Sequence, residues 1–160
     1  MDPLGSEDYR EGSLLRLKEA QTLSDNAHWV GAIYLAGRAV EAIFRSLLRQ
    51  QSKKLETGHD LKQMLTRARF LMSLSETEDD KLNEAVNEVA TVWRNDLRFA
   101  GEKRVRRQLK ASGRMHNIGQ KRVKGDPLKA NAKSVLEACE RIVTIGEPIC
   151  QRYRSLSRIS

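Results

Sequence analysis

The sequence is poor in features that mark several familiar protein classes. Its 160 residues include only two cysteines, Cys139 and Cys150. They lie within one apolar pattern and make no metal-ligand spacing with a pair of histidines. We therefore interpret both as reduced core residues of an intracellular protein, and we expect neither a metal nor another cofactor.

Long hydrophobic runs are also lacking. No apolar run approaches 18 residues, which argues against a membrane-spanning helix. The first residues, MDPLGSEDYREG, have neither the basic nor the apolar region of a signal peptide. No segment is repeated, and no run alternates between apolar and polar residues as a strand would. These absences predict a cytoplasmic protein with no strands and no membrane partner.

Positive charge, in contrast, is abundant and concentrated. Lys and Arg number 29 against 21 Asp and Glu, which gives a net charge of +8. Only one acidic residue, Glu102, lies between residues 101 and 125. The same segment holds nine cations: Lys103, Arg104, Arg106, Arg107, Lys110, Arg114, Lys121, Arg122 and Lys124. Such a block favours an acidic partner, most often nucleic acid and sometimes a membrane surface or an acidic protein.

Apolar residues at three- and four-residue spacing predict helices along most of the chain. The first covers about 6–23 and the second, the most apolar, about 27–51. Three more begin after Asp60, Ser75 and Asp126, each of which is a good N-cap. Pro148 is expected to kink or end the last helix near Glu147.

The predicted fold is therefore all-α: an up-and-down four-helix bundle with an additional short helix and a basic loop before the last helix. We expect one domain over residues 6–153. The basic loop is an insertion at 101–125, and residues 1–5 and 154–160 are expected to be flexible termini.

The second predicted helix carries two charged residues, Arg38 and Glu41, within its apolar pattern. Charged groups are rarely fully buried unless they are paired. We expect Glu41 to neutralise Arg38, Arg94 or Arg98 inside the bundle.

Three segments, in this order along the chain, resemble the HEPN family: YLAGRAVEAIFRSLL at 34–48, GHDLKQML at 58–65 and VWRNDLRF at 92–99. The resemblance covers roughly residues 7–100. HEPN domains are small helical bundles, commonly dimeric, found in prokaryotic defence and toxin–antitoxin systems, often beside a minimal nucleotidyltransferase. The resemblance thus implies a homodimer and, as one alternative, a nucleotidyltransferase partner protein.

Many HEPN proteins are metal-independent ribonucleases with an arginine, a polar residue after it, and a histidine four to six residues beyond the arginine. Arg94 matches the signature arginine and Asn95 the polar residue. The histidine position falls on Phe99, which cannot exchange a proton. On a continuous helix, Arg98 would share one face with Arg94, as a clamp for a phosphate group.

The missing proton donor leaves three functions open. The chain binds RNA or another nucleotide-bearing partner through Arg94, Asn95, Arg98 and the basic loop; or it is a metal-independent endoribonuclease; or it docks a nucleotidyltransferase antitoxin. In the ribonuclease alternative, His59 or His116 supplies the proton transfer.

Each of these residues also has a purely structural interpretation. Arg94 and Arg98 could pair with Glu41, Glu88 or Asp96, and Asn95 could cap a helix end. Trp93 and Phe99 both fit helical packing positions, so we expect both in the core. The basic loop could be a solvated surface, although nine cations against one acidic residue exceed what solubility requires.

Overall fold

The computed structural model describes residues 3–51 and 58–159, and it confirms the all-α class. The polar segment SKKLETGH at 52–59, expected to be a loop between the second and third predicted helices, lies mostly outside the described residues. The elements run in this order: α1 (Ser6–Asp25), α2 (Trp29–Gln51), α3 (Leu61–Met72), α4 (Glu76–Val92), the 3₁₀ helix η1 (Asn95–Phe99), α5 (Glu102–Ala111), β1 (Asn117–Ile118), β2 (Lys121–Arg122) and α6 (Pro127–Ser157).

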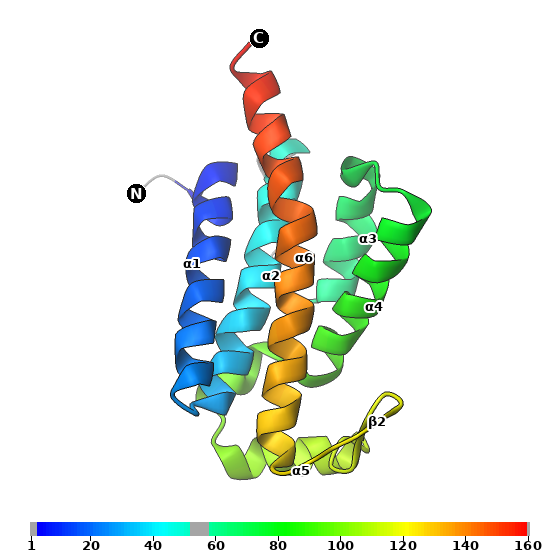
Figure 1. The fold of residues 1–160 in the computed structure, drawn as a ribbon. Coiled ribbons are helices and arrows are strands. Elements are labelled where there is room, and N and C mark those ends of the chain that lie inside the picture. The colour runs from blue at the N-terminus through cyan, green and yellow to red at the C-terminus, as the bar shows by residue number, and fades with distance from the viewer. Residues whose placement is uncertain (1–2, 52–57, 160) are drawn as a thin grey trace.

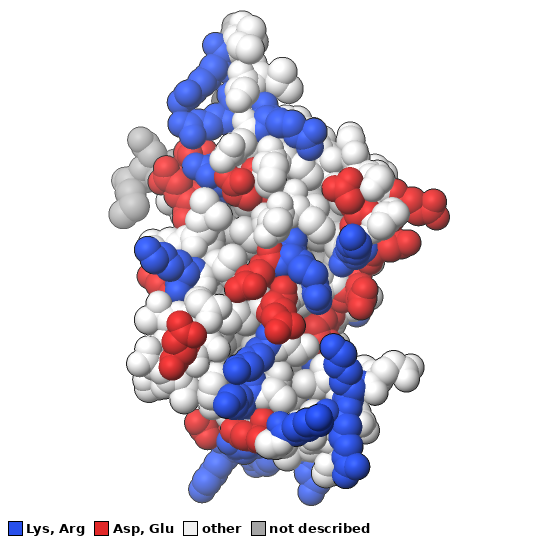
Figure 2. Space-filling model, in the orientation of Figure 1, with Lys and Arg blue, Asp and Glu red and all other residues white. Residues whose placement is uncertain are grey.

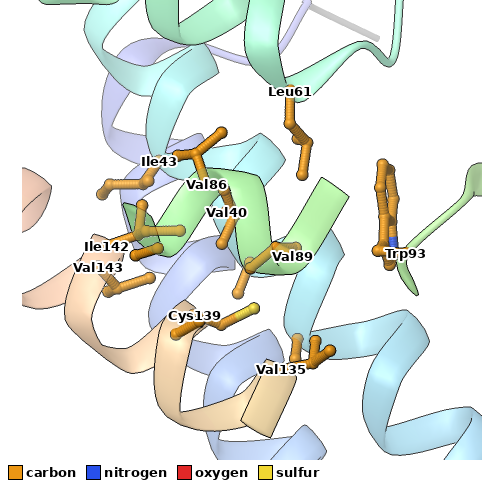
Figure 3. Packing of buried hydrophobic residues seen from close by; sticks show 14 of the residues in the cluster. Val40, Ile43, Leu61, Val86, Val89, Trp93, Val135, Cys139, Ile142 and Val143 are labelled. Atoms are coloured by element: carbon orange, nitrogen blue, oxygen red, sulfur yellow. The ribbon is translucent and has the colours of Figure 1, made fainter. Parts of the chain in front are cut away.

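The long helices stand side by side, and α5 lies across one end of them (Figure 1). Helix α2 is the centre of the bundle, with α1, α3 and α6 packed around it. Its Ile33, Val40, Ile43 and Leu47 have no exposed surface. Burying each such side chain stabilises the fold by about 1.5–3 kcal/mol. Figure 3 shows how side chains of α2, α4 and α6 meet in this core.

Three helix starts follow the sequence signals. Asp60 accepts hydrogen bonds from the backbone N–H groups of Lys62 and Gln63, at 2.9 and 3.1 Å. Ser75 accepts from Glu78 N–H, and Asp126 from Leu128 N–H. These side chains satisfy amide groups that the first turn of a helix leaves without a partner.

The buried residues of α1 are small. Leu14 and Leu15 are exposed, whereas Ser13 and Ala20 are completely buried. Ser13 fits there because its hydroxyl donates to the Ala39 carbonyl at 2.7 Å. A small residue with a satisfied hydroxyl lets α1 approach α2 closely.

Pro148 was expected to kink or end the last helix near Glu147. Helix α6 does not end there but continues to Ser157. A proline inside a helix costs about 3 kcal/mol. Contacts beyond it offset this cost, because Ile149 and Cys150 are buried and the Tyr153 hydroxyl donates to the Leu71 carbonyl at 2.8 Å. Residues 154–157, part of the terminus that was expected to be flexible, are helical.

Helix α4 ends at Val92, earlier than the apolar pattern predicted. Trp93 has an extended backbone, and its indole Nε1 donates to the Tyr34 carbonyl of α2 at 3.1 Å. The chain continues as η1, where Leu97 is buried. Arg94 and Arg98 thus do not share one face of a continuous α-helix, and that expectation is corrected.

The segment expected to be a mobile basic loop is ordered. It consists of α5 and a two-stranded antiparallel hairpin, in which Asn117 pairs with Arg122 and Ile118 with Lys121. Neither strand was predicted, because two residues are too few to show alternation. Helix α5 is the additional short helix of the predicted fold, and its Val105 and Leu109 are buried.

Candidate nucleic-acid interface

Helix α5 is anchored to the bundle by two apolar residues and one amide. Val105 and Leu109, four residues apart, are completely buried. Gln108 Nε2 donates to the Val92 carbonyl at the end of α4, at 3.1 Å. The remaining positions of α5 are mostly Lys and Arg. Because one side of the helix is held against the bundle, these basic residues occupy the two sides that flank it.

One of these sides meets η1. A cleft of ≈ 370 Å³ lies between the two elements, and its lining is rich in arginine: Arg94, Asp96, Leu97, Ala100, Arg104, Arg107, Gln108 and Ala111. We call it the arginine groove. Arg94 comes from the start of η1, while Arg104 and Arg107 are one turn apart on α5. The structure thus brings the predicted signature arginine together with part of the basic segment.

The arginines that line the groove can bind an anion. Within the described part of the chain, the side chains of Arg94, Arg104 and Arg107 form no hydrogen bond or ion pair. Asp96 is the only carboxylate among the lining residues. A planar guanidinium group matches the oxygens of a phosphate with two parallel donors. Three of them around one cleft form a site suited to a phosphodiester chain.

Two cations of the basic segment, Arg106 and Arg114, form ion pairs within the protein instead. Arg114 is buried, donates to Asn131 Oδ1 at 2.7 Å, and binds both carboxylate oxygens of Glu88. Arg106 binds both carboxylate oxygens of Asp126, at 2.6 and 3.2 Å. This hydrogen bonding raises the pKa of Arg106 and lowers that of Asp126.

The other seven expected nucleic-acid-binding residues lie on α5, in the hairpin or just after it. All are exposed, and none is ion-paired within residues 3–51 and 58–159: Lys103, Arg104, Arg107, Lys110, Lys121, Arg122 and Lys124. Gly119, in the hairpin turn, has a φ of +58°, a conformation that favours glycine. Figure 2 shows Lys and Arg gathered over the end of the molecule where α5 and the hairpin lie.

The rest of the signature is arranged differently from the sequence expectation. Phe99 is 81% exposed rather than in the core, and the Arg98 guanidinium lies 4.7 Å from the centroid of its ring. The N-cap of η1 is Arg94 and not Asn95, and the Arg94 side chain makes no capping hydrogen bond. Oδ1 of Asn95 is buried and has no hydrogen-bond partner among the described residues. Arg98 and Asn95 therefore flank the groove without lining it.

His59 does not join Arg94. Its Nδ1 lies 2.8 Å from Oε1 of Glu41, and both residues line a different cleft, of ≈ 500 Å³, between α1 and α2. Glu41 is 2% exposed and also accepts from Arg38 at 2.8 Å and Arg45 at 2.9 Å. The Arg38 pairing was one of three expected, while Arg45 and His59 were not foreseen. Arg94 and Arg98 have no contact with this carboxylate.

The described residues contain no group of three or more His, Cys, Asp or Glu side chains arranged to hold a metal ion. None of the helices in that part of the chain is long and apolar enough to cross a membrane. Comparison with protein-family models, with curated proteins and with solved structures found no match.

Proposed function

We propose that this protein is an HEPN-like bundle that binds RNA by its phosphate backbone, with the arginine groove as the central contact. The observation that carries the proposal is the meeting of Arg94, Arg104 and Arg107 in one cleft, where none of the three has an ion-pair partner among the described residues. The exposed cations of α5 and the hairpin lie at the same end of the molecule (Figure 2). Phosphate contacts of this kind supply affinity and little sequence specificity.

The choice of RNA over another polyanion rests on the resemblance of three segments to HEPN proteins. The same resemblance supports a defence or toxin–antitoxin setting and a homodimer. Binding is favoured over cleavage because the groove is lined by no histidine. Proton transfer at the ribose 2′-hydroxyl needs a group that titrates near neutral pH, and arginine does not.

Binding can be tested by fluorescence anisotropy of a labelled RNA at several salt concentrations. Each phosphate contact to a single strand contributes roughly 0.7 to the slope of log affinity against log salt. The double variant Arg104→Ala/Arg107→Ala should lower that slope by about 1.4. Arg152→Ala, an exposed arginine near the far end of α6, should leave the slope unchanged.

Two results would contradict the proposal. One is wild-type protein that binds no RNA even at low salt. The other is an equal loss of affinity in the Arg152→Ala control, which would mean that charge anywhere on the surface suffices.

RNA cleavage that survives EDTA and disappears in Arg94→Ala would replace binding by the ribonuclease alternative. A tight complex with a nucleotidyltransferase that ignores Arg94→Ala would favour the docking alternative.

A further inference from the structure

Phe99 is an aromatic residue that the fold leaves in solvent. It is 81% exposed, while its neighbours Leu97 and Ala100 turn toward the protein. Burying the ring would bring about 2 kcal/mol, so the fold forgoes that gain at this position. A single exposed phenylalanine is common and by itself means little. The residues around Phe99 are what suggest a function for its ring.

The position of Phe99 follows from the geometry of η1. In a 3₁₀ helix, side chains three residues apart lie in one row. Phe99 therefore shares a row with Asp96, which lines the arginine groove. Ala100, the next residue, lines the groove as well. The ring thus stands beside the rim of the cleft in which the arginines lie.

The Arg98 side chain already lies against the Phe99 ring. Its guanidinium carbon lies 4.7 Å from the ring centroid, within the range of a cation–π contact. A cation over one face leaves most of the ring accessible, as the exposed fraction shows. The pair therefore combines a positive charge for a phosphate with an aromatic face for a planar ligand.

We propose that Phe99 is a stacking platform for a nucleobase, and that the protein consequently prefers single-stranded RNA to duplex RNA. The inference rests on the proposed RNA binding and adds the kind of RNA. A duplex keeps its bases stacked on one another, so only an unpaired nucleotide can place a base on the ring. The base reaches Phe99 while neighbouring phosphates lie in the arginine groove. Stacking tolerates any base, so the preference concerns strandedness and not sequence.

The charge around Phe99 argues against a second copy of this chain as the occupant of the ring. Arg94, Arg98, Arg104 and Arg107 carry no ion-pair partner in the described part of the chain. Two copies meeting through this face would bring these like charges together, which is costly. A nucleic acid brings the opposite charge.

The experiment compares Phe99 variants on three probes of equal length: single-stranded RNA, duplex RNA and an abasic single-stranded oligonucleotide. Phe99→Ala should weaken binding to single-stranded RNA by roughly 5- to 150-fold, the range measured for loss of one base–aromatic stack. It should leave duplex and abasic affinity unchanged. Phe99→Trp should retain the affinity of the wild type. Phe99→Leu, which keeps apolar bulk without a π face, should behave like Phe99→Ala.

The failures of the two proposals are distinguishable. If the wild type binds single-stranded and duplex RNA equally and Phe99→Ala changes neither, the stacking role is overturned while backbone binding stands. If Phe99→Leu binds as well as the wild type, the ring acts only as apolar bulk and the stacking role is also overturned. Lower self-association of Phe99→Ala in sedimentation, with unchanged RNA discrimination, would assign Phe99 to an interface between copies. Absence of all RNA binding overturns both proposals.

Discussion

The indole of Trp93 occupies the space that a side chain on Gly37 would need. A Cβ atom placed on Gly37 would lie 2.1 Å from Cδ1 of Trp93 and 2.2 Å from its Nε1. The ring is held there by the hydrogen bond from Nε1 to the Tyr34 carbonyl. This contact between α2 and the end of α4 fixes where the chain turns into η1, and so where Arg94 lies.

Gly37→Ala should destabilise the protein and weaken RNA binding together. Overpacking of this kind costs about 3 kcal/mol, which exceeds the gain of about 1 kcal/mol that alanine brings to a helix. Guanidinium unfolding would measure the change. Gly12→Ala in α1 is the matched control, because a Cβ there meets no atom within 4 Å and should add stability. Equal behaviour of the two variants would contradict the packing explanation.

Arg114 should matter for stability, unlike its neighbours in the basic segment. Arg114→Ala removes the partner of a Glu88 carboxylate that is 20% exposed and leaves Asn131 Oδ1 without its donor. Breaking a buried pair costs roughly 3 kcal/mol. Arg107→Ala should change the free energy of unfolding by less than about 0.5 kcal/mol, because the side chain is exposed. RNA affinity should follow the reverse order. At a moderate temperature, where both variants are folded, Arg107→Ala should weaken RNA binding more than Arg114→Ala does.

Glu41→Gln should be among the most damaging isosteric changes in the chain. The carboxylate is 2% exposed and accepts from Arg38, Arg45 and His59. Gln keeps the shape and removes the charge, leaving the Arg45 guanidinium, 12% exposed, unpaired at a cost of roughly 3 kcal/mol.

Glu84→Gln on the exposed side of α4 is the control for Glu41→Gln and should cost almost nothing. Thermal unfolding of both variants checks the prediction. Similar melting temperatures for the two would mean that the buried carboxylate contributes no more than a surface one.

The two thiols should make the protein less stable in alkaline solution. Burial raises the pKa of Cys150 to about 11 from the ordinary 9.0, and burial also raises the pKa of Cys139. Because the folded-state pKa is the higher one, this contribution is complete below pH 9.0 and is lost as the pH rises toward 11. The loss approaches about 1.4 kcal/mol per pH unit for each thiol.

Comparison with Cys150→Ala separates this effect from other alkaline titrations. The variant should be less stable than the wild type at pH 7 and should lose less stability between pH 9 and 10.5. Native thiols should also react slowly with iodoacetamide at pH 8, and rapidly after unfolding. Rapid reaction of the native protein would contradict the burial of both groups.

Local signals in the sequence were enough for much of the fold. Helical periodicity predicted the long helices, and Asp60, Ser75 and Asp126 marked three of their starts correctly. Such signals work because capping and a buried stripe depend on residues within one or two turns of each other. The burial of Glu41 within α2 was foreseen on the same basis, from a charge inside an apolar pattern.

The candidate site depended on contacts that no local pattern shows. The end of α4 is decided by Trp93 and Gly37, 56 positions apart in the printed sequence. Whether a cation is ion-paired or available for binding depends on whether a carboxylate from another element lies next to it, as Glu88 lies next to Arg114. The continuation of α6 past Pro148 likewise depends on Tyr153 meeting Leu71 of α3.

The sequence by itself determined that this is a helical protein with a block of positive charge that follows Arg94, because composition and spacing are local properties. Only the tertiary structure decided that Arg94, Arg104 and Arg107 share one groove, that Arg106 and Arg114 do not take part in it, and that Phe99 faces solvent. Those outcomes depend on which elements pack together, and packing joins residues that lie far apart in the chain.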